Sequence, residues 1–546
     1  MFDFKNVRSM QIPNGNVVGI TANGLAIWGK DETIKYVSFG DSIAVGHRID
    51  ENWEKDYGWD AQYGVNGRTS TALVPGCYTD IIRGELESIY GKQHVLVTSF
   101  ARSGDKVSDL MKKLSHETVQ KALKKADLVT ICIGANDVLH YALTNLEDYI
   151  ATADSSTIDG YVAESLAVLN DDSNANSYIS LLNKLNEINP DAKYVFTTVY
   201  NPYKHLWLEE GSEKGSFFYH ILNNIPPLVI DVDRMVENTF GIDDLGIWNV
   251  AEWRWVSLEL DIDLGSYIKA NLLNTPAVKM LFKSVNAIGT LAEGYIDGND
   301  KFVGLNPILR NKINSYRETH PNFILADTKK LFDLFPSKTD TREDVDYSDL
   351  VNVEFAKDTD VTEADWGALW RDESVTAYWT QLANKHLSFK NALPSTNAWD
   401  YVAFDMNGFV GDLVADIVAR VIEPDIDPHP ENQGHQVLKR SFSNMLGLVK
   451  YESNGGKYIT GDVVLNGGKL SAPEAEKADN AFSGWCTDSV LTQALDPNRT
   501  DYVDYDSDIT LSELVSGNTI ISKLPKVTPL YAKWYDPNAA GGIQNV

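Results

Sequence analysis

The sequence has few of the features that mark a disulfide-bonded, membrane-spanning or metal-binding protein. Among 546 residues there are three cysteines, Cys77, Cys132 and Cys486, which lie far apart and form no CxxC pair. No disulfide framework is therefore expected, and Cys132, inside an apolar stretch, is expected to be a small core residue. No window approaches about 18 consecutive apolar residues, so no membrane span is expected. The ten histidines include no HExxH pattern, so we predict neither a metal nor another cofactor.

The chain is also short of positive charge, with a formal net charge of −29 at pH 7. Nucleic acid and anionic membranes would be repelled, so neither is an expected partner. The N-terminal stretch lacks the basic region and apolar run of a secretory signal. If the protein works outside a cell, we expect another route to carry it there.

What the chain does contain fits a globular protein of two to four domains, with 43% hydrophobic and 10% aromatic residues. Residues 1–30 contain Asn14-Gly15 and Asn23-Gly24 between short apolar runs, which predicts a small β-hairpin appendage. A main domain is expected over 31–448. The Gly-rich turns that follow predict a small β domain over 449–535, with a tail over 536–546.

Within the main domain, apolar strands alternate with helices, which predicts βαβ units and a parallel sheet. Strands are expected at 34–39, 93–101, 127–134, 191–200 and 322–332, and helices at 78–90, where Gly91 acts as a stop, and at 106–126. Residues 203–305 and 336–400 do not fit this pattern. We interpret both as insertions at the loop end of the sheet, and the first contains apparent amphipathic helices at 249–260 and 267–285. They could carry function or only extra packing.

Small or polar residues follow the predicted strands. "GDSI" places Ser42 at the end of the first strand, with Gly40 permitting an unusual turn and Asp41 able to cap the next helix. Ligand sites in open α/β sheets form outside the carboxyl ends of the strands. Ser42 is therefore a candidate nucleophile.

Three further segments supply what a serine nucleophile needs. Gly104 follows the second strand and could bring a backbone N–H close to a substrate oxygen. Asn136 follows the third and could donate from its amide, although an N-cap role is the alternative. His429, between two prolines, suits a general base near neutral pH.

With these four segments, "GDSI", "ARSGDKVSDL", "GAND" and "DPHPENQGH", the chain resembles the SGNH, or GDSL-like, hydrolases. The resemblance implies an α/β domain with a flavodoxin-like three-layer α/β/α fold and ester hydrolysis without a metal. Ser42 would be the nucleophile and His429 the base. The Ser42 and Gly104 N–H groups and the Asn136 side chain would form the oxyanion hole.

The sequence departs from the family at the catalytic acid. The family's usual acid lies three residues before the histidine, where this chain has Ile426. Asp427 is our preferred candidate and Asp425 the alternative, and a backbone carbonyl could also orient the imidazole.

The C-terminal pieces "ESNGGKY", "AFSGWCTDSVLTQAL" and "TPLYAKW" resemble the Listeria–Bacteroides repeat of bacterial surface proteins. This resemblance implies a β-grasp-like fold and an adhesion or spacer role outside the cell. The N-terminal segment loosely resembles tail-associated proteins of phages that infect gut bacteria. A virion tail or a bacterial cell surface is therefore the expected location, with the cytoplasm as the alternative, and an oligomer would suit a tail.

Three functional hypotheses follow. The first is a serine esterase that removes acetyl groups from a surface polysaccharide. The second is a lipase or general carboxylesterase that acts on lipids or small esters. The third is a binding protein that keeps an SGNH scaffold without catalysis.

Overall fold

The computed structural model describes residues 33–47, 63–138, 156–202, 302–336 and 426–538, apart from isolated positions, and short elements elsewhere. Its centre is a six-stranded sheet in the order β16-β9-β8-β5-β7-β6. The strands are β5 (Ile34–Gly40), β6 (Arg68–Thr69), β7 (Val95–Ser99), β8 (Leu128–Cys132), β9 (Lys193–Thr197) and β16 (Phe323–Ala326).

The five long strands of this sheet are parallel, and only the edge strand β6 is antiparallel. Taken in chain order, the parallel strands have the flavodoxin-like arrangement 2-1-3-4-5. The strand order reverses between β5 and β8, and this switch point is where such sheets bind ligands. The α/β prediction is confirmed, and each predicted strand range contains a strand of this sheet. The range 322–332 is strand only over β16, because Asp327 caps helix α16 (Thr328–Phe332), which takes up its second half. Most residues of β5, β8, β9 and β16 are buried, as in a sheet covered on both faces, whereas β7 alternates buried and half-buried residues.

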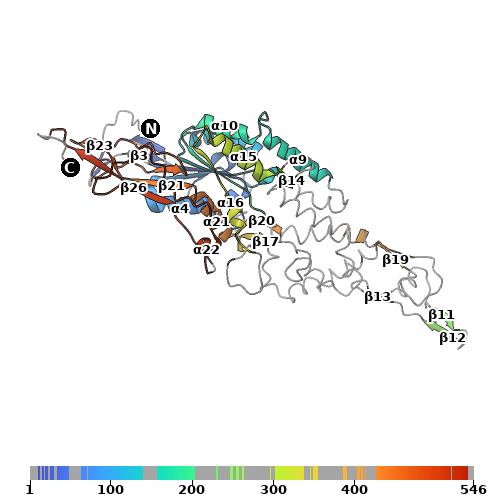
Figure 1. The fold of residues 1–546 in the computed structure, drawn as a ribbon. Helices are drawn as coiled ribbons and strands as arrows, with labels where there is room; N and C mark the ends of the chain where they lie inside the picture. The colour runs from blue at the N-terminus through green and yellow to red at the C-terminus, as the bar shows by residue number, and fades with distance from the viewer. Residues whose placement is uncertain are drawn as a thin grey trace.

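Helices cover both faces of the sheet (Figure 1). Helices α4, α16 and α21 pack together on one face, and α5, α9, α10 and α15 form the layer on the other. Their bounds are α4 (Tyr78–Tyr90), α5 (Val107–Lys113), α9 (Ser156–Asn170), α10 (Tyr178–Ile188), α15 (Leu305–Arg317), α16 (Thr328–Phe332) and α21 (Asn432–Ser443).

One predicted helix, 106–126, is two helices in the structure. Helix α5 ends at Lys113, and α6 (Glu117–Leu123) begins after His116. Ser115 and His116 are weak helix formers, so the chain can turn between two better helical segments.

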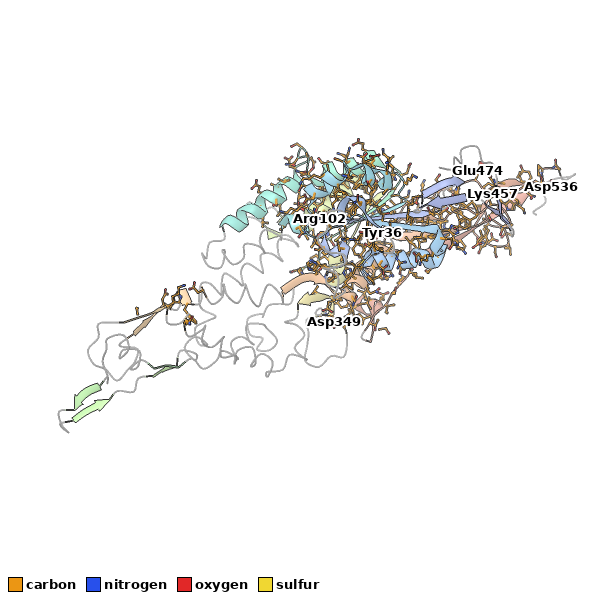
Figure 2. All side chains as sticks on the ribbon, turned by 180° about the vertical axis from the view of Figure 1, so that it is seen from behind. Tyr36, Arg102, Asp349, Lys457, Glu474 and Asp536 are labelled. Atoms are coloured by element: carbon orange, nitrogen blue, oxygen red, sulfur yellow. The ribbon has the colours of Figure 1, made fainter. Side chains whose placement is uncertain are left out.

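Buried apolar residues of the six-stranded sheet and its helices form one large core. Tyr36 lies at its centre, far from Lys457, Glu474 and Asp536 in the C-terminal region (Figure 2). Cys132 is buried in β8 as predicted, and all three cysteines are free thiols. Over the part of the chain that the structure describes, no helix is long and apolar enough to cross a membrane.

The C-terminal region forms a four-stranded mixed sheet in the order β22-β21-β26-β23. Its strands are β21 (Leu446–Glu452), β22 (Asp462–Leu465), β23 (Ala481–Cys486) and β26 (Lys526–Tyr535). The central pair β21 and β26 is parallel and the outer pairs are antiparallel, as the β-grasp-like expectation requires. Shorter elements lie between β23 and β26: α22 (Leu511–Leu514), β24 (Val515–Ser516) and β25 (Thr519–Ile520).

The N-terminal residues form two antiparallel hairpins, as predicted. They are β1 (Met10–Ile12) with β2 (Gly15–Val17), and β3 (Gly19–Ala22) with β4 (Leu25–Gly29). Of the two predicted Asn-Gly turns, Gly15 belongs to strand β2, whereas Asn14, Asn23 and Gly24 lie outside the described residues.

One prediction within the insertions is wrong. The segment read as an amphipathic helix at 249–260 contains strand β12 (Arg254–Ser257), paired antiparallel with β11 (Gly246–Asn249). Tryptophan and valine favour strands, and a short apolar run does not distinguish the two periodicities. Three more antiparallel strand pairs are β10 (Val229–Asp231) with β13 (Asp261–Asp263), β14 (Tyr295–Ile296) with β15 (Phe302–Val303), and β18 (Leu387–Phe389) with β19 (Val402–Phe404). Residues 267–285 lie outside the described residues, as does most of both insertions.

Candidate active site

The candidate nucleophile lies where β5 leaves the sheet. Gly40 has a φ of +153°, and a Cβ at this position would lie 2.5 Å from the carbonyl oxygen of Cys132. Only glycine therefore lets β5 end this close to β8. The short helix α1 (Ser42–Val45) begins immediately, so Ser42 stands at the carboxyl edge of the sheet with 8% of its surface exposed.

Asp41 fixes this turn as the N-cap of α1, one of the roles considered from the sequence. Its Oδ1 accepts a hydrogen bond from the Ile43 N–H at 3.0 Å. The carboxyl is almost fully buried, and its Oδ2 has no hydrogen-bond partner. Burial raises the pKa of Asp41 to about 7, and the carboxylates of Asp105 and Asp137 add to the rise.

His429 reaches the serine from the far end of the chain. Its Nε2 lies 2.6 Å from Ser42 Oγ. In the tautomer with Nε2 unprotonated, the serine hydroxyl donates to the imidazole, as a general base requires. His429 lies in β20 (Ile426–Pro430), which pairs with β17 (Val351–Val353). The Glu431 N–H also donates to the Leu350 carbonyl at 2.9 Å, so the histidine loop is anchored on both sides.

A second histidine, His47, lies against the first and was missed in the sequence analysis. The rings of His47 and His429 stack with centroids 3.8 Å apart and an interplanar angle of 22°. The His47 N–H donates to the Ser42 carbonyl at 3.1 Å, because Gly46 caps α1 in a left-handed conformation and turns the chain back. The only sequence signal is "SIAVGH", a histidine directly after a glycine helix stop.

The two other predicted strand-end loops contact one another. The Asn136 side-chain amide donates to the Asp105 carbonyl at 3.1 Å, next to Gly104. Gly104 has a φ of +82°, which a side chain would strain. Asn136 lies inside a helical turn at 135–138 and not before it, so it is not an N-cap. The β7 and β8 loops flank β5, on whose carboxyl edge Ser42 lies.

Buried charge holds these loops in place. Asp105 forms an ion pair with Lys113, whose ammonium also donates to the Phe100 carbonyl at 2.8 Å. Asp137 Oδ2 accepts from the Val107 N–H at 3.0 Å, and burial raises the pKa of Asp137 to about 7. The loops after β7 and β8 are thereby tied to the start of α5.

The catalytic acid stays a prediction. The side chain of Asp427 and the whole of Asp425 lie outside the described residues. Among the residues that are described, no group of three or more His, Cys, Asp or Glu side chains is arranged to hold a metal ion.

A serine and a histidine in hydrogen-bond contact, at the switch point of a flavodoxin-like sheet, define the class of a serine hydrolase domain. Residues 36–223 match the family described as GDSL-like Lipase/Acylhydrolase, and residues 448–512 match the Listeria-Bacteroides repeat domain. The GDSL-like hydrolase domain and the Listeria-Bacteroides repeat domain that the sequence analysis expected are therefore both found in the chain.

Similarity to individual proteins is more distant. The chain is 23% identical over 147 residues to the uncharacterized protein YpmR of Bacillus subtilis (strain 168), which is 27% of this chain and 48% of YpmR. The chain thus spans about half the length of this curated relative.

Two solved structures are among those that the chain matches at low identity and low TM-score. An extracellular lipase from Streptomyces rimosus is 12% identical with a TM-score of 0.28, over 56% of this chain and 83% of the lipase. Axe2, an acetylxylan esterase from Geobacillus stearothermophilus, is 14% identical with a TM-score of 0.20, over 52% of this chain and 93% of Axe2.

The buried Asp41 carboxyl predicts a pH-dependent stability. Its pKa is higher in the folded than in the unfolded state, so its ionisation opposes folding as the pH rises from about 4 to about 7. Asp41→Asn keeps the cap oxygen and cannot ionise. We expect the unfolding free energy of Asp41→Asn, relative to the wild type, to rise with pH by at most about 1.4 kcal/mol per unit. Urea unfolding at pH 5, 6 and 7 measures this difference, and a pH-independent difference would contradict the prediction.

The stacked histidines predict a positioning role for His47. His47→Ala removes the ring that covers one face of His429, and we expect Ser42 to react about tenfold more slowly with a fluorophosphonate probe. His47→Phe keeps an aromatic face and should restore most of the rate, because both variants keep the backbone hydrogen bond to Ser42. If Ser42 reacts with the probe equally fast in His47→Ala and His47→Phe, the stacked ring does not position His429.

Proposed function

We propose that the protein hydrolyses ester bonds with Ser42 as the nucleophile and His429 as the general base. The observation that carries this proposal is the 2.6 Å separation of Ser42 Oγ and His429 Nε2. A serine hydroxyl is a weak nucleophile until a base accepts its proton. A scaffold used only for binding has no need of this contact, which weighs against the non-catalytic hypothesis.

In the reaction, Ser42 Oγ attacks the acyl carbonyl carbon while its proton passes to His429 Nε2. His429 then gives the proton to the leaving alcohol oxygen, and the acyl group stays on Ser42. Water attacks this acyl-enzyme, His429 accepts a proton from the water, and the proton returns to Ser42 as the acid leaves. We propose the Ser42 and Gly104 N–H groups and the Asn136 amide as the oxyanion hole, since the strand ends that carry them are neighbours.

We propose an acetylated cell-surface glycan as the substrate. Ser42 is only 8% exposed, which favours a small acyl group. The Listeria-Bacteroides repeat domain on the same chain suits a bacterial surface, or a virion tail that contacts one. The net charge of −29 disfavours the anionic lipid surface that many lipases meet. A lipase or general carboxylesterase is the second candidate, because the same serine and histidine serve long acyl chains.

The test is turnover of p-nitrophenyl esters from acetate to long chains by the wild type and by Ser42→Ala. We expect the fastest turnover with acetate and its loss in the variant, whose missing Oγ leaves no acyl acceptor. A preference for long chains would favour the lipase alternative. Wild-type rates at the background of folded Ser42→Ala would overturn the proposal of catalysis on these esters.

The acid can be assigned by a matched pair of variants. We propose Asp427 as the group that orients His429, with Asp425 as the alternative. Asp427→Asn should lower kcat for the acetate ester by orders of magnitude, as loss of such a carboxylate does elsewhere, whereas Asp425→Asn should leave it near wild type. The reverse pattern would assign Asp425, and unchanged kcat in both would point to a backbone carbonyl.

A further inference from the structure

Helix α21 follows the candidate base His429 closely in the chain and fixes its position. His429 is followed by Pro430, then by Glu431 as the N-cap, and α21 begins at Asn432. Most of this helix is buried. Since so short a connection has little slack, a displacement of α21 would move the His429 ring relative to Ser42.

The hydrolase domain holds α21 from one side. His435 is fully buried, and its Nδ1 accepts from the Tyr78 N–H at 3.2 Å. Burial lowers the pKa of His435 to about 3, so the ring stays neutral in this contact. Further along the helix, Ser441 Oγ and Thr328 Oγ1 lie 2.6 Å apart. These contacts join α21 to α4 and α16.

The repeat domain holds the other side of α21. Lys439 is fully buried, and its ammonium donates to Ser522 Oγ at 3.1 Å and to the Lys523 carbonyl at 2.9 Å. The same ammonium forms an ion pair with Glu85 of α4. Lys439 therefore joins three elements, the two hydrolase helices and the repeat-domain segment 519–524.

A second polar contact lies at the end of the helix. The Asn444 amide donates to the Asp506 carbonyl at 2.9 Å, and the Asp506 N–H donates back to Asn444 Oδ1 at 3.1 Å. Apolar side chains complete the junction, because Ile509, Leu514 and Ile520 belong to the same buried cluster as the hydrolase core. The repeat domain is thus packed onto α21 by both polar and apolar contacts.

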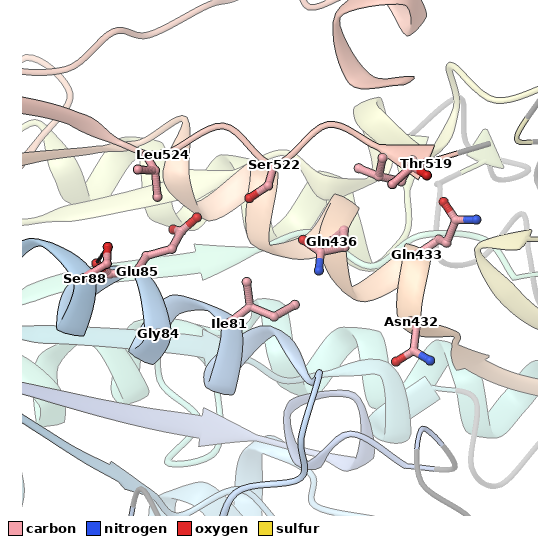
Figure 3. A pocket seen from close by; sticks show the side chains of 11 residues that line it. Ile81, Gly84, Glu85, Ser88, Asn432, Gln433, Gln436, Thr519, Ser522 and Leu524 are labelled. Atoms are coloured by element: carbon pink, nitrogen blue, oxygen red, sulfur yellow. Dashed lines mark hydrogen bonds between the residues drawn. The ribbon is translucent and has the colours of Figure 1, made fainter. Parts of the chain in front are cut away.

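A groove of about 650 Å³ runs along this junction, between α4, α21 and segment 519–524. Figure 3 shows Glu85 and Ser522 extending toward one another from opposite walls of the groove. The two domains are therefore joined here by Lys439 and its partners, with an open groove beside the contact.

We propose that the repeat domain is a positioning element of the catalytic site. Its contacts with Lys439 hold α21 in place. Helix α21 in turn keeps His429 within hydrogen-bond distance of Ser42. This inference rests on the proposed esterase function for its catalytic consequence. It extends the adhesion or spacer role that the repeat resemblance implies, and it makes Lys439 a positioning residue that touches neither substrate nor Ser42.

The test uses the full chain with the double variant Glu85→Gln/Lys439→Met. Removing both charges avoids leaving one of them buried alone, which a single substitution would do. The variant loses the ammonium contacts to Ser522 and Lys523. We expect faster amide hydrogen exchange in α21 and a kcat for p-nitrophenyl acetate about 10–100-fold lower at unchanged KM.

Lys457→Met is the matched control, because it breaks an exposed ion pair with Glu476 within the repeat domain. It should change neither exchange in α21 nor kcat. If circular dichroism shows that the double variant is unfolded, Ser522→Ala serves in its place, since it removes one acceptor and keeps both charges. Amide hydrogen exchange in α21 and kcat are then measured on Ser522→Ala. We expect smaller changes in the same directions as for the double variant.

Unchanged exchange in α21, or faster exchange with unchanged kcat, would overturn the positioning role. A raised KM with unchanged kcat would do the same, because it would indicate lost substrate binding. A wild type without turnover would overturn the esterase proposal and the catalytic consequence drawn here. Hydrogen exchange would then still decide whether the repeat domain holds α21.

Discussion

The hydrogen bond between Ser42 and His429 is the constraint on which the rest of the structure depends. It joins residues 387 positions apart in the chain, across a distance of 2.6 Å. A misplacement of about 1 Å can lower the rate of a reaction by about 100-fold, so both ends need rigid supports. The close approach of Gly40 to β8 supports the serine, and the pairing of β20 with β17 supports the histidine.

Carboxyl groups removed from water near Ser42 cost folding free energy when they are ionised. The buried carboxyl of Asp41 and the half-buried carboxyl of Asp137 have pKa values raised to about 7, and Asp105 is buried with Lys113 as its counter-ion. Asp41 and Asp137 each accept a hydrogen bond from a backbone N–H at the start of a helix, which an apolar side chain could not do. Perturbed carboxyls of this kind gather at functional sites, because order is needed there more than stability.

The two sequence-defined modules do not correspond to two separate packing units. Strand β21 begins at Leu446, and its first residues lie in the hydrolase core. The Tyr90 hydroxyl lies within hydrogen-bond distance of the carbonyls of Val449 and Asp462. A tethered spacer would expose these groups to water. Their burial indicates that the repeat domain and the hydrolase domain stabilise one another.

The sequence by itself determined the parallel sheet, because continuous apolar runs and helical spacing are local patterns. It also determined the strand ends that carry Ser42, Gly104 and Asn136. It could also select His429, since two prolines make its loop rigid and the segment "DPHPENQGH" resembles the SGNH pattern. Only the tertiary structure decided that His47 stacks on His429 and that Lys439 joins α4, α21 and the repeat domain. Those contacts join residues that are not adjacent in the chain, and their energy comes from burial and geometry that no local pattern records. The hairpin at 246–257 was misread for a related reason, because pairing between strands, and not local periodicity, decides a short apolar run.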